Sequence, residues 1–174
     1  MADLLEQLGP NQPTLCAGWT TADLAAHLMI REHRIGAALG IVMKPLAAWN
    51  ARAMAKAAPE FVRNIALLRA GAPRWSPLRW LESQVGAFEF LIHHEDVRRA
   101  QPGWEPRDLT AIDRQLWTLV TRSGRFSMAR SSAPVMVVTP DGRTFGAPGG
   151  IRVVGEPMEL LLYLTGRTDV ARVD

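Results

Sequence analysis

Apolar residues recur at helical spacing through most of the first 130 residues. The pattern predicts a short helix over 1–8 and a stronger one after Thr20, where Thr20 and Asp23 have the spacing of a capping box. Further helices are expected over 47–58, 59–70, 77–100 and 109–128, several of them ending at Gly or Pro. Of the six helices expected in this part of the chain, four are predicted to be the principal ones.

The period changes after residue 131. Short β-rich runs over 135–139 and 151–154 flank the turn signal Pro140-Asp141-Gly142 and a glycine-rich loop, and 156–164 reads as a short amphipathic helix. The fold class expected is mainly α, with a first domain over 1–131 and a small C-terminal α+β element, a β-hairpin plus a helix, over 132–174.

Composition places the chain among ordinary globular proteins, since 48% of its 174 residues are hydrophobic and 21% are charged. The single cysteine, Cys16, excludes an internal disulfide and a cysteine-built zinc module, so a reducing compartment is expected. The sequence has no apolar run of membrane-spanning length and no leader pattern, so we expect a soluble, cytoplasmic protein that does not bind a membrane.

The net charge of +3 does not indicate a nucleic-acid partner. Of the 20 basic residues only Lys44 and Lys56 are lysines, and the arginines are scattered among 17 acids rather than gathered in a block.

Three residues have the pattern of a metal site. Glu89 and His93 are four residues apart, which puts both on one face of the predicted helix. His27 lies on the inward stripe of another helix, and helical bundles build metal sites from facing helices. A set of two His and one Glu would leave a coordination position open, as catalytic zinc sites do.

Other interpretations of the same residues remain open. A histidine on an apolar face is often a hydrogen-bonded core residue, and Glu89 could be a solvated flank. Asp96 could orient the imidazole of His93, or pair with Arg98 or Arg99.

The remaining candidates are interpreted structurally. His94 is turned about 100° from His93 around the helix, and His33 is likewise off the face of His27. Asp23 is explained by its capping role. Cys16 has apolar neighbours in sequence, which favours a buried structural cysteine over a redox or nucleophilic thiol.

Three segments resemble one protein family. They are Pro-Thr-Leu-Cys-Ala-Gly-Trp-Thr at 13–20 running into Asp-Leu-Ala-Ala-His-Leu at 23–28, the segment 89–99, and Gly-Glu-Pro-Met-Glu-Leu-Leu-Leu-Tyr-Leu-Thr-Gly-Arg at 155–167. Together they resemble the N-terminal family of mycothiol-dependent maleylpyruvate isomerases, in the DinB/YfiT-like superfamily. The segment 89–99 most resembles an actinobacterial subfamily of metal-binding proteins.

The resemblance implies a DinB-like four-helix bundle that binds a divalent metal, usually zinc, through His27, Glu89 and His93. It also implies a low-molecular-weight thiol such as mycothiol as co-substrate, and Arg167, in the closing Gly-Arg pair, as the arginine that assists catalysis. The C-terminal part is shorter than the tail of the isomerase, so the substrate and the isomerase activity do not carry over directly.

The function expected is therefore a metal-dependent S-transferase or thiol-assisted isomerase that acts on a small electrophilic or anionic substrate. Two alternatives stay open. One is hydrolysis by a metal-bound water, with Glu95 or Asp96 as general base. The other is a metal-stabilised binding or sensor protein without catalysis, whose helix pairs could form a homodimer.

Overall fold

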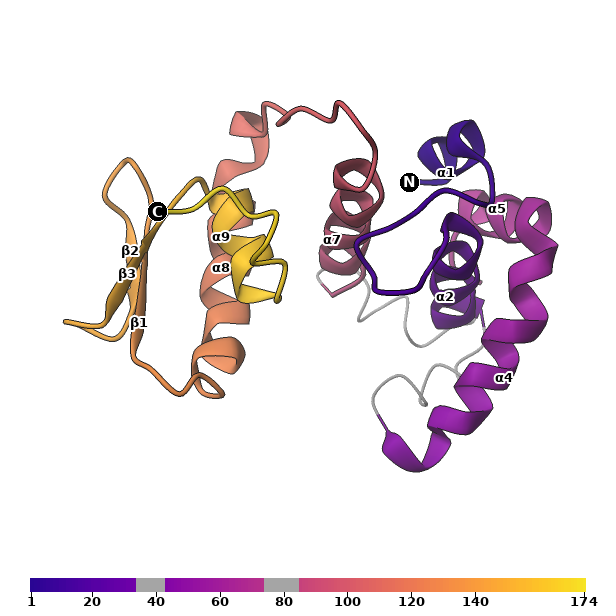
Figure 1. Ribbon diagram of the computed structural model, residues 1–174, viewed down its shortest axis with the longest axis horizontal. Coiled ribbons are helices and arrows are strands. Elements are labelled where there is room, and N and C mark those ends of the chain that lie inside the picture. Colours follow the sequence, from indigo (N-terminus) through magenta and orange to yellow (C-terminus); the bar gives the residue numbers. More distant parts are fainter. Residues whose placement is uncertain (34–42, 74–84) are drawn as a thin grey trace. The chain divides into compact units, whose positions relative to one another are not determined.

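The computed structural model describes residues 1–33, 43–73 and 85–174, and it is mainly helical with a small three-stranded sheet (Figure 1). The chain divides into two compact units, Met1–Trp104 and Glu105–Asp174. The boundary expected from the sequence lies later, after residue 131. The difference arises because the helix expected over 109–128 packs within the second unit, against that unit's closing helix and a strand.

The first unit confirms the helices expected from periodicity. Its helices are α1 (Ala2–Leu8), α2 (Thr21–His33), α4 (Ala47–Ala57), α5 (Phe61–Ala70) and α7 (Val85–Arg99), with short 3-10 turns at Lys44–Leu46 and Ala58–Glu60. The first residues of the helix expected over 77–100, from Pro77 to residue 84, lie outside the described residues.

Local signals set the start of α2 and the end of α1. The backbone N–H of Thr20 donates to Oδ2 of Asp23 at 2.9 Å, and the N–H of Asp23 lies 3.4 Å from Oγ1 of Thr20, which is the reciprocal pattern of a capping box. Helix α1 ends at Gly9, whose φ of 78° is a conformation that glycine adopts without steric cost.

Helix α2 lies at the centre of the first unit. Leu24 and Leu28 on its inward stripe are fully buried and pack with Leu5 of α1, Ile65 of α5 and Val97 of α7. Three helices thus cover one stripe of α2, and that stripe also carries His27.

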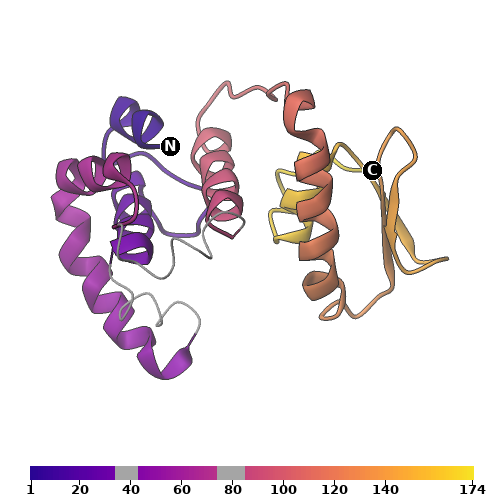
Figure 2. The same cartoon turned by 180° about the vertical axis from the view of Figure 1, so that it is seen from behind.

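The second unit is an α+β element. A 3-10 turn (Thr110–Ile112) leads into α8 (Asp113–Met128), followed by β1 (Val135–Val138), β2 (Thr144–Gly146), β3 (Ile151–Val154) and α9 (Pro157–Leu164). Both ribbon views place α8 and α9 on the same side of the sheet (Figures 1 and 2).

The strand pairing in this unit is β2-β1-β3. Strands β1 and β2 form the antiparallel hairpin, whereas β3 runs parallel to β1, with Val135 opposite Ile151. Strand β2 was not expected from the sequence, because its three residues give too short a pattern to detect. The helix expected over 109–128 begins at Asp113, after a 3-10 turn in which Ile112 is 36% exposed.

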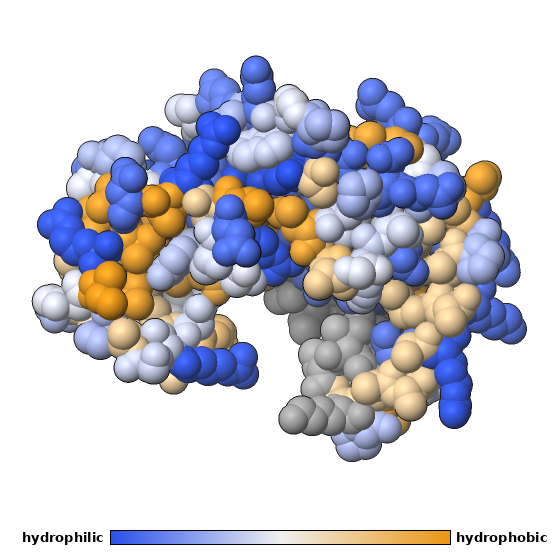
Figure 3. Space-filling view, in the orientation of Figure 1, coloured by the Kyte–Doolittle hydropathy of each residue, from blue (hydrophilic) through white to orange (hydrophobic). Residues whose placement is uncertain are grey.

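The surface mixes hydrophilic and hydrophobic side chains, and in the view of Figure 3 hydrophobic ones gather over the sheet of the second unit. Ile151 of β3, for example, is 60% exposed. No described helix combines the length and the hydropathy needed to cross a lipid bilayer.

Candidate metal centre

Helices α2 and α7 bring the three predicted ligands together. His27 of α2 and Glu89 and His93 of α7 each offer a ligand atom, and these atoms all lie within 4.8 Å of one another. The rings of His27 and His93 meet edge to face with their centroids 5.3 Å apart. The spacing of four residues on α7 and the inward position on α2 thus converge on one point.

The distances fit a metal centre after a small closure. Zinc binds imidazole and carboxylate ligands at about 2.0–2.2 Å, so ligand atoms in a tetrahedral site are about 3.3 to 3.6 Å apart. Because no separation exceeds 4.8 Å, reaching that spacing requires movements of at most about 1.5 Å, the scale of a side-chain rotation of Glu89 or of the two rings.

His27 is in the protonation state that a metal ligand needs. Its residue is 6% exposed, and burial, followed by the neighbouring His93 and Arg31, lowers its pKa from 6.5 to about 4. The imidazole is therefore neutral near pH 7, with a nitrogen lone pair free to bind a cation.

Asp96 orients the second histidine. Its Oδ2 lies 2.9 Å from Nδ1 of His93, and Asp96 is fully buried. Because a carboxylate only accepts hydrogen bonds, Nδ1 carries the proton and Nε2 is the nitrogen left for a metal. Of the two alternatives for Asp96, this geometry supports the orienting role. Arg98 and Arg99 each form an ion pair with Glu95.

Glu89 is not a solvated flank. Its side chain is 28% exposed and accepts a hydrogen bond from Nη1 of Arg31, one turn beyond His27 on α2. The guanidinium of Arg31 also stacks over Phe90 of α7, 5.3 Å from the ring centroid. The ion pair with Arg31 therefore compensates the charge of the partly buried Glu89 carboxylate, and a bound metal cation would compensate the same charge.

Cys16 lies closer to polar groups than its sequence neighbours indicate. Its Sγ is 3.7 Å from Nδ1 of His93 and donates to Oδ2 of Asp96 at 3.4 Å. The loop that carries it is held to α7 by the hydrogen bond from the N–H of Leu15 to the carbonyl of Asp96. The expected apolar setting is confirmed only in part, because Cys16 packs against the apolar core around Leu24 and also contacts His93 and Asp96.

Cys16, His93 and Asp96 form a second group with metal-binding side chains, which shares His93 with the first. Sequence reasoning could not have found this group, because Cys16 is 77 residues from His93 and follows no helical spacing. The two groups differ in their ligands: the first has the borderline N,N,O set typical of catalytic zinc, and the second adds a soft sulfur.

The other histidines lie outside both groups. His33 lies at the end of α2, and its Nε2 is 3.3 Å from the backbone carbonyl oxygen of Leu67, within hydrogen-bond distance. His94 is part of neither group, as its angle to His93 predicts.

Arg167 lies in the second unit, at the end of α9. Its Nη1 donates to the carbonyl of Thr165 at 2.7 Å, and its backbone N–H donates to the carbonyl of Leu162. These bonds satisfy carbonyls at the helix C-terminus, which is a structural use for an arginine there. Its catalytic role stays a prediction.

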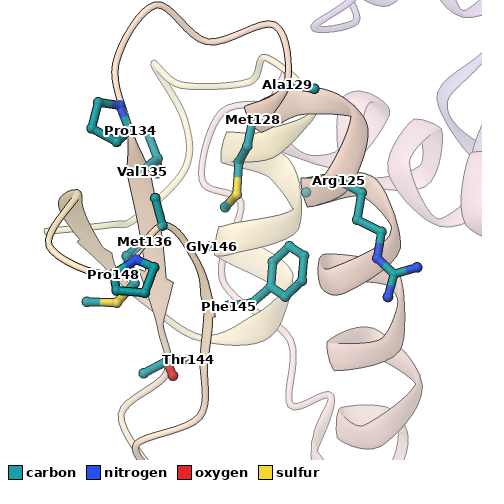
Figure 4. A pocket seen from close by; sticks show the side chains of 12 residues that line it. Arg125, Met128, Ala129, Pro134, Val135, Met136, Thr144, Phe145, Gly146 and Pro148 are labelled. Atoms are coloured by element: carbon teal, nitrogen blue, oxygen red, sulfur yellow. The ribbon is translucent and has the colours of Figure 1, made fainter.

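A separate hollow of about 590 Å³ lies in the second unit among α8, β1 and β2, with Phe145, Met128 and Arg125 on its walls (Figure 4). Its lining is mostly apolar and contains no acid, histidine or cysteine, so it holds none of the chemistry of the metal centre.

Comparison with known proteins found no matching family model, no matching curated protein sequence and no matching solved structure.

Proposed function

We propose that this protein is a divalent-metal-dependent enzyme that uses a small thiol, such as mycothiol, as an S-transferase or in a thiol-assisted isomerisation. The observation that carries the proposal is the convergence of His27, Glu89 and His93 from two helices. Three protein ligands leave a coordination position for an exogenous group, whereas structural zinc is usually closed by four.

The chemistry of the donor set favours zinc as the metal, although the same ligands also suit other divalent ions. A bound divalent cation would hold the sulfur of a thiol as thiolate at neutral pH, ready to attack an electrophilic carbon. The resemblance of segments 13–28, 89–99 and 155–167 implies the same chemistry and a DinB-like four-helix bundle, in which α2 and α7 would be the helices that carry the ligands.

The protein's own side chains prepare the site for that role. Burial keeps His27 neutral, and Asp96 fixes the tautomer and orientation of His93. Cys16 adds a sulfur beside His93, but the adjacent carboxylate of Asp96 disfavours a negative charge on it. The nucleophile is therefore expected to be an exogenous thiol.

The geometry supports hydrolysis less well. The two acids that could act as general base on a metal-bound water are already engaged, Glu95 by Arg98 and Arg99 and Asp96 by His93.

Native mass spectrometry tests the proposal directly. Protein loaded with zinc and mixed with mycothiol, or with glutathione for comparison, should show a ternary mass of protein, metal and thiol. An S-methylated thiol should give no such mass, because it cannot bind as thiolate. Conversion of a fluorogenic electrophile such as monochlorobimane should then exceed the rate of the thiol alone.

Two controls separate the alternatives. Glu89→Gln should lose the ternary mass together with the metal. Stoichiometric metal binding without any thiol adduct would contradict the thiol chemistry and favour a binding or sensor protein, and the same spectra would show whether a homodimer forms.

A further inference from the structure

Arg31 has buried hydrogen-bond donors that the ion pair with Glu89 does not use. Its side chain is only 13% exposed, and Nη1 donates to Glu89. Nε and Nη2 are fully buried and have no hydrogen-bond acceptor within the described residues. Buried donors are almost always satisfied in proteins, because leaving one unpaired forfeits the hydrogen bond it made with water.

The two unused donors form one edge of the guanidinium. Nε–H and Nη2–H are parallel, which matches the spacing of two oxygens in a carboxylate or phosphate group. The ring of Phe90, 5.3 Å from the guanidinium carbon, limits rotation of the plane, and the bond to Glu89 fixes the opposite side. The edge is therefore held in one orientation beside the predicted metal ligands.

We propose that this edge of Arg31 binds a small oxyanion, a carboxylate or phosphate group of the substrate or thiol co-substrate. The inference rests on the proposed function only in assigning the oxyanion to a substrate or co-substrate. Arg31 is then a specificity-determining residue that positions one end of the ligand while its reacting end lies at the metal centre.

Glu89 couples metal binding to oxyanion binding at Arg31. In the structure its carboxylate neutralises Arg31, but a metal bound to His27, Glu89 and His93 would share that negative charge. Arg31 would then attract an external anion more strongly. Because linkage between binding sites is reciprocal, the oxyanion should also raise the affinity for the metal.

The substitution Glu89→Gln removes the negative charge beside Arg31 without any metal, so it tests directly whether Arg31 then binds an oxyanion. Metal-free Glu89→Gln protein is titrated with sodium acetate and, separately, with inorganic phosphate, at constant ionic strength set by chloride. The Nε–H signal of Arg31 is followed by ¹H–¹⁵N NMR and identified by its loss in Arg31→Lys, since lysine has no such group. We expect a saturable shift, with an affinity about tenfold higher than in the metal-free wild type.

The Nε–H signal of Arg69 is the internal control, because this arginine is in the same unit but is exposed and paired with Asp3 and Glu6. It should not shift saturably. If Glu89→Gln does not fold, zinc-loaded wild type takes its place against the metal-free wild type, with the same expectation.

A shift with acetate alone or with phosphate alone supports the proposal and identifies the group. No saturable shift of the Arg31 signal with either anion, in folded protein, overturns it. The proposed function fails separately, through the absence of bound metal, and that result would leave oxyanion binding by the metal-free variant unaffected.

Discussion

Burial of His27 predicts that the stability of the metal-free protein depends on pH. Its pKa is lowered to about 4 in the folded state, against about 6.5 in the unfolded chain. Above pH 6.5 the imidazole is neutral in both states and its contribution to stability is complete. Between about pH 6.5 and 4 the unfolded chain takes up a proton that the folded protein does not, so about 3 kcal/mol of stability is lost.

Urea unfolding at about pH 7.5 and about pH 4.5 measures this loss. His27→Gln should show a smaller difference between the two pH values, because glutamine does not titrate, while His93 and Arg31, which face His27, are unchanged. Equal pH dependence in wild type and His27→Gln would show that His27 is not held neutral by the fold.

Asp96 should set the metal affinity without binding the metal. Asp96→Asn removes the carboxylate that holds Nδ1–H of His93, so the metal affinity should fall by about 10- to 100-fold. Competition with a chromogenic chelator measures it. Asp23→Asn, which alters the cap of α2 instead, should leave the affinity unchanged, and an equal loss in both variants would argue against the orienting role.

Cys16 should react slowly despite its polar neighbours. The carboxylate of Asp96, 3.4 Å from Sγ, disfavours the thiolate that attacks an alkylating agent. Iodoacetamide should therefore modify Cys16 in native protein at neutral pH more slowly than it modifies glutathione. Faster modification would make Cys16 a candidate nucleophile.

At the residue scale, the sequence predicts what depends on spacing along a helix. Glu89 and His93 share a face because they are four residues apart, and His27 falls on the inward stripe of α2. Arg31 lies on the same stripe, but Glu89 is 58 residues away in the sequence, and their pairing depends on how α2 and α7 meet. The contacts of Cys16 depend on a loop, which has no period from which to predict them.

At the element scale, helices were predicted more closely than strands. Periodicity over ten or more residues placed the start of α2 and both bounds of α5 and α8 within a few residues of those observed. Strands of three or four residues carry little periodicity, so β2 was missed. The parallel pairing of β3 follows from the path of the loop between Gly146 and Ile151, which the pattern of the strands does not specify.

The cap of α2 offers a prediction at this scale. Thr20→Ala removes the side chain that meets the N–H of Asp23, and should lower the free energy of unfolding by about 1 kcal/mol. Chemical denaturation measures the change. Thr118→Ala, at an exposed position within α8, should have little effect, and an equally small effect of Thr20→Ala would contradict the capping role.

At the scale of the whole molecule, the chain is two compact units and the predicted metal ligands all belong to the first. The helix expected over 109–128 was assigned to the first domain because the strand-like pattern begins only after residue 131. An amphipathic stripe shows only that a helix has a partner. The partners of α8 are α9 and β2. The apolar stripe of α8 does not show whether a helix packs against a sheet or against other helices.

The central claim is that His27, Glu89 and His93 form one metal site. Metal analysis of protein purified without a histidine tag tests it most directly. Wild type, His94→Ala and Cys16→Ser should each retain stoichiometric divalent metal, since neither His94 nor Cys16 belongs to this set.

The single substitutions His27→Ala, Glu89→Ala and His93→Ala should each lose the metal while circular dichroism shows a folded helical protein. Full metal content in all three variants would contradict the account. Loss of metal in Cys16→Ser together with its retention in Glu89→Ala would move the site to the group formed by Cys16, His93 and Asp96.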